Sequence, residues 1–144
     1  MKSITILAWA LLLGALPATA AAQTGFRIVV NPANHIASLK AADASKIFLR
    51  KWPKWATGQA VVVVDQVESS PVRKAFSQAI HGMDVPSVKS YWQELVFSGK
   101  GTAPAEKGSD AEVIAFVKAN PDAVGYVAPD AAGLAEVKVV PLTP

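Results

Sequence analysis

Four consecutive valines at positions 61–64, with an amphipathic segment soon after them, restrict the fold of this chain more than any other feature. β-Branched residues favour strands, and an unbroken apolar run is typical of a strand buried on both faces. Ser70 and Pro71 then predict the start of a helix, because serine is a good N-cap and proline suits the first helical position. Gly82, directly after His81, is expected to end it. A buried strand followed closely by a helix indicates an α/β fold.

The first 22 residues have the pattern of a cleaved secretory signal peptide. Lys2 precedes an apolar run at 4–16 and an alanine-rich stretch at 17–22. The apolar run is shorter than the ~20 residues of a spanning helix, so we expect no membrane span after cleavage. The chain has no cysteine, hence no disulfide and no site for lipid attachment. Residues 23–144 are expected to form a single domain, located in the periplasm of a Gram-negative source.

The remaining segments alternate between strand and helix patterns. Ser38 is the expected N-cap of a helix at 40–49, and Ser109 with Glu112 forms a capping box at the start of a helix at 109–119. Alternating strands and helices predict a mainly parallel sheet in a three-layer α/β sandwich. Further strands are expected at 26–30, 123–127 and 137–140, and further helices at 40–49, 84–96 and 109–119.

Four stretches, taken in order, resemble the type 2 periplasmic solute-binding proteins, and among them the phosphate-binding subunits of ABC transporters. The stretches are 46–49 with 55–58, the strand, loop and helix at 63–76, 91–92 with 97–101, and 120–127. The last has the sequence N-P-D-A-V-G-Y-V, which is similar to the family's N-P-G-A-I-G-Y-V. A full member has two lobes, whereas the mature chain is long enough for one. The resemblance therefore implies the fold of a single lobe.

The same resemblance implies a function and a site. It implies a non-enzymatic exported protein whose candidate ligand is phosphate or another oxyanion and whose candidate partner is an ABC permease. In the family the loop after the valine strand has the pattern R-x-D-x-S-G-T. The matching positions here are Gln66, Glu68, Ser70, Pro71 and Val72, so the acid and the serine remain while the arginine and threonine are replaced. Because a bidentate guanidinium is a strong oxyanion ligand, its loss implies weak binding.

The residues themselves also indicate an anion site in the loop 65–69 and the helix start. Ser69 and Ser70 supply hydroxyls at the positive end of a helix, and Arg73 and Lys74 add cations. The alternative is that Ser70 only caps the helix and that the cations are solvated. The candidate ligand-binding residues are Gln66, Glu68, Ser69, Ser70, Val72 and Arg73.

Other functional classes have less support. His35 and His81 lie in different segments, there is no cysteine nucleophile, and no clustered ligands predict a metal site, so we expect no enzyme, metal or cofactor. A hydrolase that uses Asp65 or Glu68 is the weakest alternative. The net charge of +3 is too small to indicate a nucleic-acid partner.

One further alternative remains open, which is a ligand-free interaction module that keeps the lobe fold and docks on an envelope protein. The cations and aromatic residues at 50–55 are expected to be a solvated rim, with Trp55 covering the edge of the core. The sequence makes no prediction about the oligomeric state.

Overall fold

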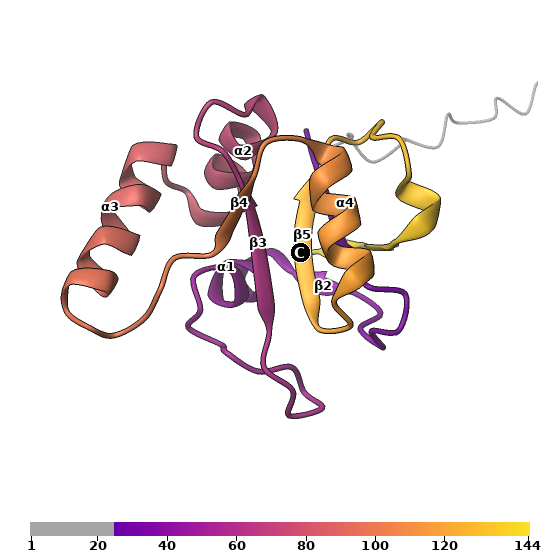
Figure 1. Ribbon diagram of the computed structural model, residues 1–144, viewed down its shortest axis with the longest axis horizontal. Helices are drawn as coiled ribbons and strands as arrows, with labels where there is room; N and C mark the ends of the chain where they lie inside the picture. Colours follow the sequence, from indigo (N-terminus) through magenta and orange to yellow (C-terminus); the bar gives the residue numbers. More distant parts are fainter. Residues whose placement is uncertain (1–24) are drawn as a thin grey trace, which may run out of the picture.

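A computed structural model describes residues 25–144, which form a central sheet covered by helices (Figure 1). The expected signal peptide, 1–22, lies outside the described residues. The strands are β1 (Arg27–Val30), β2 (Leu39–Lys40), β3 (Val62–Gln66), β4 (Ala105–Lys107), β5 (Ala123–Val127), β6 (Lys138–Val140) and β7 (Leu142–Thr143). The helices are α1 (Ala41–Phe48), α2 (Pro71–Phe76), the π-helix η1 (Ser77–His81), α3 (Val85–Phe97), α4 (Asp110–Ala119) and the 3-10 helix η2 (Leu134–Glu136).

The main sheet has the strand order β4-β3-β5-β1-β6. β3 pairs parallel with β4 and with β5, whereas β1 pairs antiparallel with β5 and β6. All strands of this sheet except β1 therefore run in the same direction, which confirms the predicted mainly parallel α/β sheet. The short parallel pair β2 and β7, and the edge strand β4, were not predicted.

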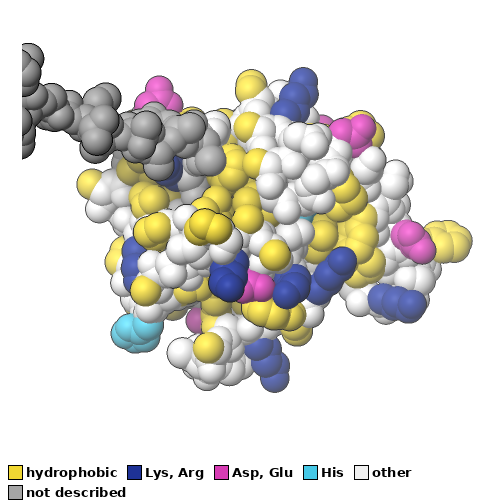
Figure 2. Space-filling model, turned by 180° about the vertical axis from the view of Figure 1, so that it is seen from behind, with side chains coloured by type: hydrophobic (Ala, Val, Ile, Leu, Met, Phe, Trp, Pro, Cys, Tyr) yellow, Lys and Arg dark blue, Asp and Glu magenta, His cyan; other side chains and the backbone are white. Residues whose placement is uncertain are grey.

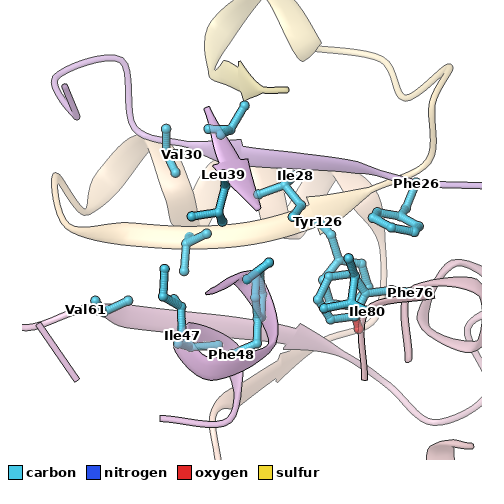
Figure 3. Close-up of a cluster of buried hydrophobic side chains, with 14 of the residues drawn as sticks. Phe26, Ile28, Val30, Leu39, Ile47, Phe48, Val61, Phe76, Ile80 and Tyr126 are labelled. Carbon is cyan, nitrogen blue, oxygen red and sulfur yellow. The ribbon is translucent and has the colours of Figure 1, made fainter. Parts of the chain in front are cut away.

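Helices cover both faces of the sheet and create two hydrophobic cores. On one face α1, α2 and η1 pack over aromatic residues, where the rings of Phe76 and Tyr126 stack with centroids 3.9 Å apart (Figure 3). On the other face α4 places Val113 and Val117 against Val64 of β3. This arrangement confirms the predicted three layers.

Local signals located most helix ends correctly. The Ser70 hydroxyl accepts from the Arg73 N–H at 3.2 Å, and Gly82 has a left-handed φ of 62° after His81. The prediction that Ser38 caps the first helix is wrong. The helix follows Lys40, whose side chain makes no capping hydrogen bond, because Leu39 and Lys40 form β2 and separate Ser38 from α1.

The helix α3 lies apart from the sheet, at the left of Figure 1. It is attached through Val88 and Trp92, which pack against Leu49 at the end of α1. The Tyr91 hydroxyl also donates to the Leu49 carbonyl at 2.7 Å. The far end of α3 is therefore free to present apolar side chains to solvent.

No helix within residues 25–144 combines the length and the apolar character needed to cross a bilayer.

Candidate functional site

The candidate site lies where β3 ends and α2 begins. The sequence predicted that Asp65 lies in the loop 65–69, but β3 extends to Gln66, so Asp65 belongs to the strand and is mostly buried. Gln66 is buried, and its Nε2 donates to the Tyr126 carbonyl and to Asp110 Oδ1, both at 2.9 Å. The side chain that replaces the family's arginine therefore joins β3 to β5 and α4, and points into the protein.

Ser70 is also buried, and its hydroxyl is hydrogen-bonded within the protein. Its hydroxyl donates to Gln66 Oε1 at 2.6 Å and accepts from the Arg73 N–H. The structure confirms that Ser70 caps the helix, and it also shows that the hydroxyl proton is already used.

Arg73 is a buried cation held by carboxylates, with only 2% of its side chain exposed. Nη1 donates to the Gln66 carbonyl at 2.6 Å and lies 3.1 Å from Glu106 Oε1, while Nη2 lies 3.4 Å from Asp65 Oδ2. Its Nε is buried without a hydrogen-bond partner among the described residues. Arg73 therefore neutralises two acidic side chains, and it is not the solvated cation of the alternative interpretation.

Arg73, Asp65 and Glu106 form a buried network, and Tyr126 joins it because its hydroxyl donates a hydrogen bond to Asp65. Burial raises the pKa of Asp65, although the neighbouring Arg73 guanidinium acts in the opposite direction. Burial also raises the pKa of Tyr126, and the Asp65 charge adds to that effect. Sequence reasoning missed this network because its members lie on separate elements. The one available signal was a carboxylate directly after a valine strand.

The solvent side of the site consists of Glu68, Ser69 and the first turn of α2. Glu68 Oε1 lies 2.6 Å from Lys89 Nζ of α3, and this contact lowers the pKa of Glu68. Ser69 is exposed, and the Val72 N–H is a first-turn helix donor with no intrahelical acceptor. These two groups are available to an anion, and Lys74, the second cation predicted at this site, is exposed.

A cleft of about 400 Å³ opens beside Glu68 and Arg73. Its apolar wall comes from α3 and from Ala103 before β4.

A second hollow, of about 570 Å³, includes Trp55. Trp55 is buried in the core and its Nε1 donates to the Asp122 carbonyl at 3.0 Å, which confirms its predicted place at the edge of the core. Within residues 25–144, no three potential metal ligands are clustered.

The fold is similar to solved phosphate-binding proteins. A phosphate transport receptor of an ABC system from Vibrio cholerae matches with a TM-score of 0.64 and 20% identity, over 82% of this chain and 46% of its own. A protein from Clostridium perfringens, described as a phosphate ABC transporter substrate-binding protein and solved with bound phosphate, has a TM-score of 0.64 and 19% identity over 82% of this chain and 44% of its own. PstS from Borrelia burgdorferi has a TM-score of 0.56 and 13% identity over 83% and 47%.

This chain thus spans less than half the length of these structures, and its fold is that of one lobe of a phosphate-binding protein. No profile of a known sequence family matches the chain, and no curated protein matches it.

Proposed function

We propose that this chain is an exported, non-enzymatic binding protein of the phosphate ABC-transporter class that binds an oxyanion weakly at the start of α2. Its partner in this role is an ABC permease. The observation that carries the proposal is the position of the α2 N-terminus, at the carboxyl end of the interior strand β3, in a fold shared with a phosphate-bound structure. Ligands of open α/β sheets bind preferentially at this edge.

The groups at this position suit an anion. α2 continues into η1, so the first-turn amides carry the positive end of a helical segment that runs from Pro71 to His81. The Ser69 hydroxyl and the Val72 N–H can donate without breaking any hydrogen bond of the protein. Charge-assisted hydrogen bonds of this kind are about twice as strong as neutral ones.

Several features limit the affinity. Ser70 donates to Gln66, and Arg73 is already paired with Asp65 and Glu106. Glu68 adds a further carboxylate at the site. We therefore expect a dissociation constant in the high micromolar range or weaker, equivalent to about 5 kcal/mol of binding free energy.

Phosphate and sulfate titrations by calorimetry test this proposal. The Ser69→Ala variant removes an exposed hydroxyl and should weaken phosphate binding about tenfold without a change in unfolding free energy. Ser70→Ala should lower the unfolding free energy by about 1 kcal/mol, because it removes the cap. It should also weaken binding, since the first-turn amides lose their anchor. If Ser70→Ala lowers the stability but leaves the affinity for phosphate unchanged, Ser70 only caps the helix and takes no part in anion binding.

Glu68 offers a sharper test of the ligand. A carboxylate can accept a hydrogen bond from protonated phosphate, but it repels sulfate, which carries no proton at neutral pH. We expect the wild-type protein to prefer phosphate, and Glu68→Gln to abolish this preference by strengthening sulfate binding. Sub-micromolar binding by the monomer, or no binding of either anion at millimolar concentration, would contradict the proposal.

A further inference from the structure

The positive charge of this chain is concentrated in one segment. Residues 44–64 contain four basic residues and no acidic residue, while the rest of the chain has ten basic and eleven acidic residues. Among the described residues, Arg50, Lys51 and Lys54 form no ion pair, and only Lys46 pairs with an acid, Asp43, at 3.1 Å. This segment therefore carries the positive excess of the chain, and most of its charge is not neutralised by carboxylates.

The turn after α1 holds one of these cations in a strained backbone conformation. The Lys51 N–H donates to the Lys46 carbonyl at 2.8 Å, and the Arg50 N–H donates to the Ile47 carbonyl at 3.0 Å, which is the pattern of a Schellman motif. Arg50 has a left-handed φ of 56°, at the position of the motif where glycine is usual because it has no Cβ. Backbone strain of this kind concentrates at functional positions.

Trp52 adds an exposed aromatic group to the same turn. It is 45% exposed, and Lys46 Nζ lies 4.4 Å from the centre of its ring. All residues at 51–54 are exposed, and a bridge between Lys54 and Ala60 holds the loop in place. Figure 2 shows the face opposite to the one that α4 covers, where Lys and Arg side chains lie across the lower middle beside hydrophobic ones. We refer to residues 50–54 as the basic turn.

The basic turn suits an anionic phospholipid surface better than a nucleic acid. Tryptophan is enriched at membrane–water interfaces, and basic side chains beside it are attracted to anionic lipids. The loop between α1 and β3, which contains the turn, projects at the bottom of Figure 1 and is accessible to a flat surface. Nucleic acids bind such segments by stacking bases on free aromatic faces, whereas Lys46 already covers one face of the Trp52 ring.

We propose that the basic turn binds the surface of an anionic phospholipid membrane, with Trp52 at the level of the headgroups and the three unpaired cations against the lipid phosphates. This peripheral binding goes beyond the proposed function and uses a different surface. The Val61 N–H donates to the Pro53 carbonyl just before β3 begins, whereas the start of α2 lies beyond the end of β3.

Co-sedimentation with lipid vesicles tests the proposal. The processed chain, residues 23–144, is used because it contains the three hydrophobic clusters and lacks the apolar run at 4–16, which would bind lipid by itself. It should bind vesicles of phosphatidylcholine mixed with phosphatidylglycerol, should not bind pure phosphatidylcholine, and should be released as salt is added. At equal ionic strength, sodium phosphate should release it no better than sodium chloride, because the α2 start is not involved.

Charge reversal locates the surface. Lys51→Glu combined with Lys54→Glu should weaken binding to the anionic vesicles at least about tenfold. The matched control combines Lys107→Glu with Lys118→Glu, which changes the net charge equally but beside α4, on the opposite face of the sheet, and should have a much smaller effect. Equal binding by the two double variants, or equal binding of wild type to neutral and anionic vesicles, would overturn the proposal.

Arg50→Gly separates a role in lipid binding from a role in the fold. Glycine relieves the left-handed strain, so the free energy of unfolding should not fall, whereas vesicle binding should weaken several-fold because a cation is lost. A variant that is less stable but binds vesicles as wild type does would contradict the proposed role of Arg50. Binding of double-stranded DNA as tightly as of anionic vesicles, at the same ionic strength, would overturn the choice of a lipid surface.

Discussion

At the scale of single residues, His81 is held in its neutral form. Its Nδ1 lies 2.8 Å from the Ser45 hydroxyl, and its ring meets the edge of Phe76. Burial, and then the nearby charges of Lys51 and Arg73, lower the pKa of His81 from 6.5 to about 4. The unfolded chain therefore binds a proton in this pH range that the native protein does not bind.

This difference predicts a loss of stability in mild acid. Because the unfolded state gains a proton first, the His81 contribution is fully present above pH 6.5 and is lost as the pH falls towards 4. Between pH 6.5 and pH 4 we expect the free energy of unfolding to fall by about 2 kcal/mol, a value that allows for partial screening of His81 by solvent. Urea unfolding of wild type and His81→Gln across this range measures it, since the variant should lose that part of the pH dependence. His35→Gln is the control, and an identical slope in wild type and His81→Gln would contradict the prediction.

At the scale of elements, Gly125 determines how closely β5 can approach its neighbours. A Cβ at this position would lie 2.7 Å from Val64 Cγ1 of β3 and 2.8 Å from Val113 Cγ1 of α4. Both contacts are shorter than packed carbon atoms tolerate. The glycine within N-P-D-A-V-G-Y-V thus permits the close packing of α4 on the sheet.

Gly125→Ala should therefore destabilise the protein by about 1–3 kcal/mol through overpacking. Urea unfolding measures the effect. The matched control is Gly101→Ala, whose Cβ would meet only Leu95 Cδ2 at 3.4 Å and should be nearly neutral. Val64→Ala should partly relieve the clash, so the double variant should be less destabilised than the sum of the two changes. Strict additivity would argue against a direct clash.

At the scale of the whole molecule, the two cores and α3 differ in how firmly they are held. β3 and β5 lie inside the sheet between both cores, whereas α3 is attached through the small cluster of Leu49, Val88 and Trp92. Segments with few buried contacts open at lower free energy than the core.

Hydrogen exchange followed by mass spectrometry should reflect this difference. In dilute solution the amides of α3 should exchange before those of β3 and β5. The internal control is α4, a helix of similar length whose Val113 and Val117 are fully buried, and it should exchange more slowly than α3. Equal protection of α3 and α4 would show that α3 is part of the main cooperative unit.

Much of the fold could be predicted from the sequence, because its signals are local. The cap at Ser70, the proline after it and the glycine at 82 each act within one turn of the chain. The valine run and the segment 123–127 have enough apolar character to identify buried strands. β4 could not be found in this way. Its three residues are mostly exposed, and its pairing with β3 alone makes it a strand.

Only the tertiary structure decided how the candidate site is arranged. The sequence by itself placed Gln66, Ser70 and Arg73 near one another, but it could not show that they bind one another. Arg73 becomes buried because Asp65 and Glu106, on two neighbouring strands, neutralise it from both sides. Burying a cation is costly without such partners, and these carboxylates are brought together by strand pairing rather than by spacing along the chain.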